Sequence, residues 1–434
     1  MERVWTTQLG AHVGERVRVA GWLHRLRLLS NFSFLILRDG QGLAQIFIDD
    51  AALSARLAAL RAETVLAIEG TVVAEPQAPG GVEIHAPAVE VLAEAAAPPP
   101  FDLFRPTVKA QLPTLLDNAP VGLRHPRQRG LFRMAAASMA GFRAALAARD
   151  FVEIQTPKIV GAATEGGANV FRIDYFGQPA YLSQSPQLYK QIMVGVFERV
   201  FEVGPAFRAE PHDTPRHINE FVSLDVELGF IRDHHDVMEL LNRVLESMVA
   251  AIQAELAAGT IGALPRPLPA VPARIPAIHF TEALELYSQA TGDDARGEPD
   301  LAPAHERWLG EWASREHGSD FLFVWGYPTA KRAFYTHPDP ARPGYSRGFD
   351  LLFRGLELVS GGQRLHRYDD YLAVLAERGM PAESFAGYLQ AFRHGMPPHG
   401  GFAIGLERWV ARLIEAPNIR ETTLFPRDLA RLTP

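Results

Sequence analysis

Two arginines flank a short turn near the middle of the chain. The first lies in Phe207-Arg208-Ala209-Glu210 and the second in Arg216-His217-Ile218-Asn219-Glu220-Phe221, with the loop 211–215 between them. Guanidinium groups suit phosphate oxygens, and an acid two residues after Arg208 can read the amine of a base. The segment can therefore hold a nucleoside triphosphate. Taken alone, it is equally compatible with a strand pair that carries surface arginines.

Two further segments could take part in the same chemistry. Residues 400–409 read Gly-Gly-Phe-Ala-Ile-Gly-Leu-Glu-Arg-Trp, in which glycines allow close backbone packing and Arg408 follows at a strand-to-helix junction, where it can meet a terminal phosphate. Residues 151–159 read Phe-Val-Glu-Ile-Gln-Thr-Pro-Lys-Ile, a strand that Pro157 stops. Each segment is ordinary alone, but the three together, in this order, are hard to produce by chance.

The composition excludes several classes of protein. The 434 residues suggest two to four domains, and 47% hydrophobic with 21% charged residues is typical of globular chains. No apolar run approaches the roughly 18–20 residues of a membrane span, so we expect no membrane association. The absence of cysteine excludes disulfides, thiol catalysis and thiolate metal sites, and fits the reducing cytoplasm, where we expect the protein.

The net charge of −7 does not exclude a nucleic-acid partner, because binding depends on local charge. The window 16–38 holds five arginines and no acid. It belongs to a region predicted to form strands at 16–23, 32–37 and 43–48, a helix at 53–61, and strands at 65–74 and 82–84. Three strands, a helix and two strands is the order of a five-stranded OB barrel, although a generic small barrel would give a similar pattern.

Ala95–Pro100, with its proline run, predicts a stiff connector. We expect a barrel domain at 1–97, a linker at 98–120 and a second domain at 121–434. In the second domain we expect helices at 128–149, 233–256 and from 407, and strands at 151–154, within 180–230, within 349–360 and at 402–406. The stretch 257–320 is rich in Ala, Pro and Gly and predicts a peripheral insertion.

Together the three segments resemble motifs one, two and three of the class II aminoacyl-tRNA synthetases. The preceding barrel narrows the resemblance to the Asp/Asn/Lys subgroup, and the likeness covers essentially the whole chain. It implies a multidomain α+β fold, with an OB anticodon-binding barrel and a catalytic domain built on an antiparallel sheet flanked by helices. It also implies a homodimer with Pro157 near the interface.

The amino-acid pocket resembles that of the aspartyl branch, whose archaeal-type members have a similar length. In Ser185-Pro186-Gln187-Leu188-Tyr189-Lys190-Gln191, the Lys190 ammonium would suit a side-chain carboxylate, and an asparaginyl enzyme usually lacks this lysine. Arg364, in a segment that resembles the next family element, would grip the same carboxylate. Thr164-Glu165-Gly166-Gly167 resembles a loop that closes over the substrate. A solvated helix lysine and a plain flexible loop are the alternatives. The implied aspartate-binding residues are Glu165, Gln187, Leu188, Tyr189, Lys190, Arg208, Ser360 and Arg364.

The resemblance also implies an ATP site and a Mg²⁺ site. Arg208 and Arg408 are the implied catalytic residues, with Arg208 on the α-phosphate and Arg408 on the outer phosphates. Asp350, Glu357 and Ser360 would bind Mg²⁺ with hard oxygen ligands. The implied ATP-binding residues are Arg208, Ala209, Glu210, Arg216, His217, Ile218, Phe221, Glu357, Gly405, Leu406, Glu407 and Arg408. The implied reaction joins L-aspartate to ATP as aspartyl-adenylate and then to the 3′-hydroxyl of tRNA, without a dedicated general base.

On the barrel, Phe34 matches the family position that stacks an anticodon base, and Gln45 and Glu63 match residues that bond the central bases. We expect one of Phe32 and Phe34 to lie in the core. His24 and Pro79 depart from the residues of enzymes restricted to tRNA-Asp. We therefore expect aspartate to be placed on both tRNA-Asp and tRNA-Asn, with an amidotransferase acting downstream. Ordinary barrel variation is the alternative explanation.

Four other functions remain open. An asparaginyl-tRNA synthetase is disfavoured by Lys190, and an asparagine synthetase on the same catalytic fold is disfavoured by the barrel. A strictly tRNA-Asp-specific enzyme differs only in the anticodon contacts. A catalytically dead paralogue should have lost Arg208, Glu357 or Arg408, and the chain retains all three.

Overall fold

The computed structural model describes residues 1–161, 169–211 and 214–433. The chain forms two compact units, one of Met1–Leu131 with Ala258–Gly262 and the other of Phe132–Ala257 with Ala263–Thr433. Across these described ranges, none of the helices combines the length and apolar character that a membrane crossing requires.

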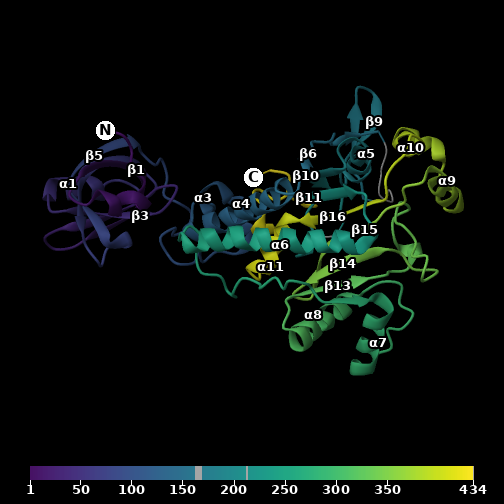
Figure 1. The fold of residues 1–434 in the computed structure, drawn as a ribbon. Coiled ribbons are helices and arrows are strands. Elements are labelled where there is room, and N and C mark those ends of the chain that lie inside the picture. The colour runs from purple at the N-terminus through teal and green to yellow at the C-terminus, as the bar shows by residue number, and fades with distance from the viewer. Residues whose placement is uncertain (162–168, 212–213, 434) are drawn as a thin grey trace. The chain divides into compact units, whose positions relative to one another are not determined.

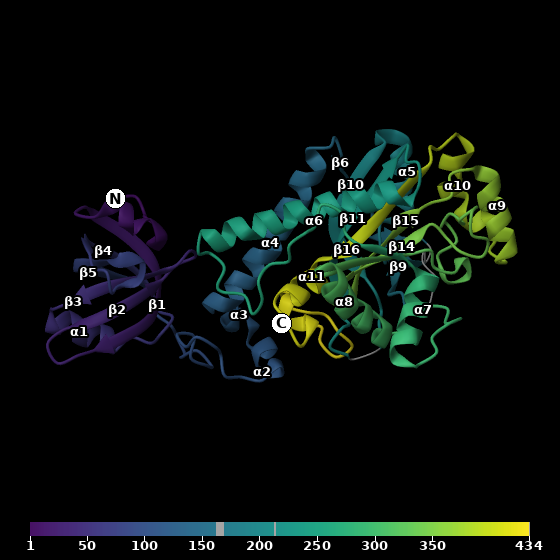
Figure 2. The ribbon, with the colours of Figure 1, turned by 60° about the horizontal axis from the view of Figure 1, so that its bottom comes forward.

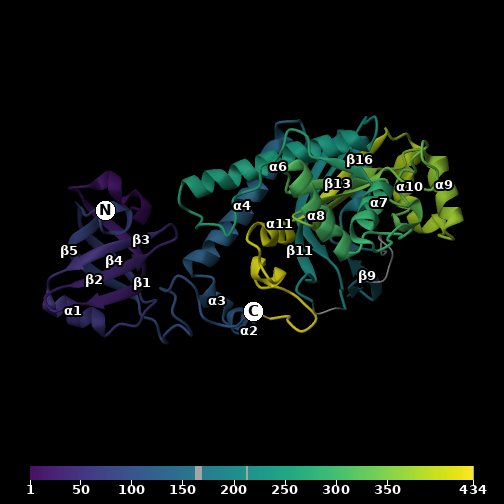
Figure 3. The ribbon, with the colours of Figure 1, turned by 90° about the horizontal axis from the view of Figure 1, so that it is seen from below.

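The first unit contains a closed five-stranded barrel in the order β1-β2-β3-β5-β4. Leu35, Leu37 and Ile46 point into its core, and the buried Leu57 of α1 lies in the same cluster, so that α1 closes one end (Figure 3). The predicted OB barrel is confirmed. Its elements are β1 (Arg16–Leu28), β2 (Ser33–Arg38), β3 (Leu43–Ile48), α1 (Ala51–Ala58), β4 (Val65–Ala74) and β5 (Val82–Ala93), followed by α2 (Leu112–Asp117) and α3 (Ala119–Gly122).

The hairpin between β2 and β3 turns at Asp39-Gly40-Gln41-Gly42. The Asp39 backbone N–H donates to the Gly42 carbonyl at 3.1 Å. The Asp39 carboxylate accepts from the backbone N–H groups of Gln41 and Gly42, both at 2.8 Å. An aspartate at this position thus satisfies the donors of the turn and fixes the register of the two strands.

The second unit is built on an eight-stranded sheet in the order β12-β13-β14-β15-β16-β11-β10-β6 (Figure 1). The inner pairs are antiparallel, as expected, whereas β12 pairs with β13 and β6 with β10 in parallel at the two edges. The chain between β6 and β10 forms a separate three-stranded sheet in the order β7-β9-β8.

The strands are β6 (Val152–Glu153), β7 (Ile159–Val160), β8 (Arg172–Tyr175), β9 (Gln178–Leu182), β10 (Arg199–Phe207), β11 (Glu220–Gly229), β12 (Ala277–His279), β13 (Phe321–Trp325), β14 (Gly348–Phe353), β15 (Leu356–Gln363) and β16 (His399–Gly405). The helices are α4 (Pro126–Ala147), α5 (Gln187–Phe197), α6 (His234–Ala257), α7 (Phe280–Thr291), α8 (Pro303–His317), α9 (Tyr368–Glu377), α10 (Ala386–Arg393) and α11 (Leu406–Leu413).

Helices α4 and α6 pack against each other beside the sheet (Figure 2). Ser247 Oγ donates to the Gly141 carbonyl at 2.8 Å, and a β-carbon at Gly141 would lie 2.5 Å from the Ser247 carbonyl oxygen. Glycine at this position therefore sets how closely the two long helices approach.

One sequence prediction differs from the fold. Within 180–230 we predicted strands around loops, but Gln187–Phe197 forms helix α5. The stretch 257–320, predicted as a peripheral insertion, supplies β12 at the edge of the main sheet and helices α7 and α8, which bury Leu284 and Leu309 in a shared core cluster.

Candidate active site

A cavity of about 350 Å³ opens beside strands β11, β15 and β16. It collects residues that lie far apart in the sequence, and many of those predicted for the site are among them. The predicted residues that line it are Gln187, Arg208, Glu210, Arg216, His217, Ile218, Phe221, Glu357, Ser360, Arg364, Gly405, Glu407 and Arg408.

The half of the cavity that was predicted to bind the nucleotide, which we call the nucleotide half, is formed where β10 and β11 end. Phe207 pairs with Glu220, so the loop between them begins with Arg208 at the mouth of the strand pair. The Arg208 guanidinium lies 5.6 Å from the centre of the Phe221 ring. Glu210 accepts from Asn169 Nδ2 at 3.3 Å, which orients its carboxylate. The exposed guanidinium of Arg208, the ring of Phe221 and the oriented carboxylate of Glu210 are therefore grouped as the sequence predicts.

The predicted metal-binding residues lie together on the β14–β15 hairpin, where Asp350 pairs with Ser360. Ser360 Oγ lies 2.7 Å from Asp350 Oδ1 and 3.1 Å from Glu357 Oε1. The Asp350 carboxylate, together with burial, raises the pKa of Glu357 to about 7. Two carboxylates that repel each other around a hydroxyl form a set of hard oxygen donors that fits a divalent cation such as Mg²⁺.

Asp350 has a second partner that the sequence did not reveal. Arg332 Nη1 and Nη2 donate to its two carboxylate oxygens at 3.0 and 2.7 Å. Arg332 lines the cavity, whereas Asp350 itself does not. No pattern around Lys331-Arg332 marks this arginine, because its loop has no periodicity and its partner lies on a distant strand.

The half of the cavity that was predicted to bind the amino acid, which we call the amino-acid half, is built over four buried charges. Lys190 Nζ donates to Asp225 Oδ1 at 3.0 Å and lies 3.5 Å from Glu227 Oε2. Arg364 Nε and Nη2 donate to the Glu227 carboxylate at 3.0 and 3.4 Å, and Nη2 also reaches the Gly401 carbonyl at 3.0 Å. Although burial opposes it, Arg364 and Lys190 hold the pKa of Glu227 below its usual value. These four residues form a compensated cluster of two cations and two anions.

Asp225 and Glu227 were missed by the sequence analysis, although a signal existed. On β11, Ser223, Asp225 and Glu227 alternate with the apolar Leu224 and Val226. A period of two places the three polar side chains on one face, and in the structure that face carries the cavity residues Ser223 and Asp225.

Several predicted residues do not line the cavity. Lys190 lies beneath it and is 1% exposed, because its ammonium is held by the acids of β11. Leu188 packs into the core cluster around Tyr371. Glu165 and its loop lie outside the described residues. The others that do not line it are Tyr189, Ala209, Leu406 and Asp350.

Glu407 lines the cavity through a buried carboxylate. Both of its oxygens accept from the Val222 backbone N–H, at 3.0 and 3.1 Å. Burial raises the pKa of Glu407 to about 7. This acid therefore joins the start of α11 to strand β11 behind Phe221.

On the barrel, the aromatic side chains do not lie where we expected. Phe32 and Phe34 are both half-buried and neither is in the core, because Ser33 and Leu35 take the inward positions. Phe32 and Phe34 pack with Phe47 at ring-centre distances of 5.4 and 6.0 Å, and Phe47 stacks on His85 at 4.8 Å. We call Phe32, Phe34, Phe47 and His85 the aromatic face.

Gln45 lies next to this face, and its side-chain partner is Glu83. Gln45 Nε2 donates to Glu83 Oε2 at 2.9 Å, and His85 Nε2 lies 2.7 Å from Glu83 Oε1. The sequence analysis missed Phe47, Glu83 and His85. The alternation of β3 and β5, with Ile46 and Ile84 in the core, would have placed all three on the outer surface.

Glu63 and His24 are buried in an ion-pair cluster instead. Arg38 donates to both Glu63 oxygens at 2.7 Å, Arg124 donates to one of them at 3.0 Å, and His24 Nδ1 lies 3.1 Å from Arg38. Burial and the charge of Arg38 lower the pKa of His24 to about 4. The reason is a bulge in β1 between Leu23 and Arg25, which turns His24 inward.

Pro79 is exposed, in the turn between β4 and β5. Gly80 and Gly81 follow it with φ of +73° and +74°, so the turn depends on glycine.

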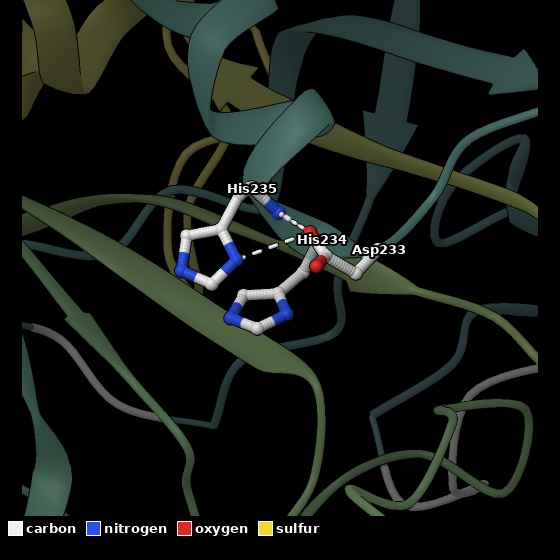
Figure 4. Close-up of side chains that lie close together, drawn as sticks. All are labelled: Asp233, His234 and His235. Atoms are coloured by element: carbon white, nitrogen blue, oxygen red, sulfur yellow. Dashed lines mark hydrogen bonds and ion pairs between the residues drawn. The ribbon is translucent and has the colours of Figure 1, made fainter.

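One group of potential metal ligands lies outside the cavity. Among the described residues, Asp233, His234 and His235 bring a ligand atom each within 4.8 Å of one another (Figure 4). Asp233 Oδ1 accepts from the His235 backbone N–H at 2.8 Å and from its ring at 3.0 Å. Asp233 therefore serves as the cap at the start of α6.

Comparison with known proteins gives consistent likenesses for both units. The profile of the family described as "tRNA synthetases class II (D, K and N)" matches residues 111–429, and that of an "OB-fold nucleic acid binding domain" matches 17–92. An aspartate–tRNA(Asp/Asn) ligase of Thermus thermophilus is 46% identical over the whole of both chains. An aspartate–tRNA(Asp) ligase of Pyrococcus horikoshii is 39% identical over 97% of each. A crystal structure of asparaginyl-tRNA synthetase from P. horikoshii, complexed with asparaginyl-adenylate, matches with a TM-score of 0.88 and 31% identity, covering all of both chains.

Proposed function

Because this chain belongs to the class II tRNA synthetases of the D, K and N group, we propose that it activates L-aspartate with ATP and transfers the aspartyl group to tRNA. The observation that carries the choice of amino acid is the pair of buried cations, Lys190 and Arg364, at the amino-acid half of the cavity. The other cavity residues do not distinguish between the amino acids that the members of this group activate.

The free N–H donors of Arg364 favour a carboxylate over an amide. No described residue accepts from Nη1 of Arg364, which lines the cavity and has donors left for a ligand. Two N–H groups of a guanidinium suit two carboxylate oxygens, whereas the amide of asparagine would bring its own N–H groups against them. ATP–pyrophosphate exchange tests this choice. Exchange with aspartate is expected, and exchange with asparagine alone would contradict the proposal.

The first step joins an α-carboxylate oxygen of aspartate to the α-phosphorus of ATP, and the bond to the departing diphosphate breaks. Arg208 neutralises charge that develops on the α-phosphate, and Phe221 and Glu210 hold the adenine. In the second step the 3′-hydroxyl of tRNA attacks the aspartyl carbonyl, the bond to the phosphate breaks, and AMP leaves with its phosphate taking up the hydroxyl proton. Positioning and charge stabilisation carry both steps, so no side chain is assigned as general base.

Asp350, Glu357 and Ser360 would hold Mg²⁺, which supplies positive charge to the phosphates when bound. Their oxygen ligands fit the ion, and Arg332 already pairs with Asp350. Arg216, His217 and Arg408 line the same cavity and would bind the outer phosphates. Titration with EDTA is expected to abolish exchange, and added Mg²⁺ to restore it.

The barrel, residues 1–97, reads the anticodon through its aromatic face. We propose that both tRNA-Asp and tRNA-Asn are charged, as in the name of the T. thermophilus relative. An amidotransferase would then convert the aspartyl group on tRNA-Asn, and we propose that the enzyme acts in the cytoplasm with its tRNAs. A two-by-two charging assay tests this proposal. Aspartate on tRNA-Asp alone would favour the restricted type, represented by the P. horikoshii ligase.

A homodimer is supported by exposed apolar residues around Pro157. Val152 on β6 is 38% exposed and Ile159 on β7 is 48% exposed. Apolar side chains on two edge strands are suited to burial against a second copy. Light scattering at micromolar concentration is expected to give twice the chain mass, and a monomer would contradict the dimer.

A further inference from the structure

A buried hydrogen-bond network lies behind the amino-acid half of the cavity. Its members are Gln187 and Gln191 of α5, Tyr371 of α9, Tyr388 of α10 and His399 of β16, and each is at most 8% exposed. Only Gln187 reaches the cavity. The network therefore offers a way for three helices and a strand to act on one cavity side chain.

Two backbone carbonyls fix the direction of the hydrogen bonds. The single Tyr371 hydroxyl proton goes to the Leu365 carbonyl at 3.0 Å, so the Tyr371 oxygen can only accept from its other neighbours. His399 Nδ1 lies 2.9 Å from the Pro397 carbonyl and must carry the ring proton, which leaves Nε2 as an acceptor in the neutral ring. Burial lowers the pKa of His399 to about 4, which keeps the ring neutral.

Both acceptors face the same amide. Gln191 Nε2 lies 3.3 Å from the Tyr371 oxygen and 3.1 Å from His399 Nε2, so it must donate to both. The amide oxygen of Gln191 then points the other way and accepts from Gln187 Nε2 at 3.1 Å. Reversing the Gln191 amide would set its oxygen against two acceptors inside the core, which costs the desolvation of unpaired groups.

The orientation of the Gln187 side-chain amide follows from its bond to Gln191. One N–H of Gln187 Nε2 donates to Gln191, and turning the Gln187 amide over would break this bond. The amide therefore offers Oε1 as its acceptor for a group in the cavity, and no described residue donates to Oε1. A carbonyl oxygen accepts hydrogen bonds and cannot donate them. The substrate group that meets it must therefore carry a proton. In aspartate with both carboxylates ionised, that group is the α-ammonium.

We infer that Gln191, Tyr371 and His399 are positioning residues for the amino-acid substrate, and that they hold the Gln187 amide with its carbonyl oxygen toward the α-ammonium. This inference rests on the proposed activation of an amino acid. None of the three positioning residues contacts the cavity, and they act only through Gln187.

The test is amino-acid-dependent ATP–pyrophosphate exchange by three variants of the full chain. Gln191→Leu removes the acceptor that orients Gln187, and the KM for aspartate is expected to rise about tenfold, the effect of one hydrogen bond to a charged group. The KM for ATP and kcat are expected to change less than twofold. Tyr371→Phe, which leaves His399 to orient Gln191, is expected to raise the KM for aspartate about threefold, and it replaces Gln191→Leu as the test if that variant does not fold.

Tyr388→Phe is the matched control. Its hydroxyl lies 2.8 Å from the Tyr371 oxygen and 3.1 Å from Gln191 Oε1, but removing it leaves Gln187 as a donor to that oxygen. The KM for aspartate is expected to stay within twofold of the wild type.

Inhibition by succinate separates amide orientation from general damage to the pocket. Succinate has both carboxylates of aspartate but no ammonium, so its inhibition constant is expected to be the same for Gln191→Leu and the wild type. An unchanged KM for aspartate in both test variants, or an equal weakening of succinate, would overturn the inference. If the wild type activates asparagine instead, the proposed substrate is wrong. In that case the test compares asparagine with succinamate, which lacks only the α-ammonium group.

Discussion

At the cavity floor, Lys190 beneath it and Arg364 in its lining are almost fully buried against Asp225 and Glu227. On the barrel, the rings of the aromatic face are half-buried and pack mainly on one another. A buried charge that loses its partner destabilises the protein, whereas a half-exposed ring that is removed leaves the core intact. Substitutions in the first region should therefore change both folding and chemistry, and those in the second should change tRNA binding alone.

The largest effect is expected from Lys190→Met. Removing the ammonium leaves Asp225 and Glu227 close together in the core, and we expect the free energy of unfolding to fall by about 3–5 kcal/mol. Urea denaturation measures this loss. Arg232→Met is the control, because its ion pair with Asp236 is exposed to solvent on the arginine side, and we expect little change in the free energy of unfolding. An equal decrease in the free energy of unfolding in both variants would contradict the expected difference between buried and exposed charges.

Arg208→Ala separates chemistry from folding within the cavity. Arg208 is exposed, so we expect stability to change by less than about 0.5 kcal/mol. The loss of charge opposite the α-phosphate should lower kcat for ATP–pyrophosphate exchange by about 10²–10³-fold. Arg199→Ala, at the other end of β10, provides the control and should retain full exchange. Exchange that survives in Arg208→Ala would contradict the assigned role.

The cavity was largely predictable because strand pairing imposes its spacing. Ser223 pairs with Gly405 and Asp350 with Ser360, so segments with fixed sequence offsets meet at fixed places. Arg332 could not be predicted, because its approach to Asp350 depends on an irregular loop. On the barrel, His24 was misplaced by one bulge, since an extra residue in a strand reverses which side chains face inward.

Phe47→Ala tests the barrel side of the comparison. The loss of one stacking ring should weaken tRNA binding by about 1–3 kcal/mol, measured as a higher KM for tRNA in aminoacylation. Exchange without tRNA should be unchanged. Val73→Ala removes an exposed apolar side chain elsewhere on the barrel and should have no effect on either assay. A fall in tRNA-free exchange in Phe47→Ala would mean that the two regions are not independent.

The smallest effect is expected from Pro79→Lys. Added positive charge in this turn should favour tRNA-Asp over tRNA-Asn by up to about tenfold in relative charging, equivalent to about 1.4 kcal/mol. Gln77→Lys places the same charge on the same exposed turn and controls for general attraction to RNA. The same shift in both variants would show that position 79 has no special part in discrimination.

The contact between Glu63 and Arg124 bears on how the protein can be divided experimentally. Glu63 belongs to the barrel by sequence, but one of its two arginine partners follows α3, well beyond the proline-rich connector. A fragment that stops at that connector would leave the buried carboxylate with Arg38 alone. An autonomous anticodon module, made for RNA-binding studies or grafted onto another enzyme, must therefore extend through Arg124 to keep its charges matched.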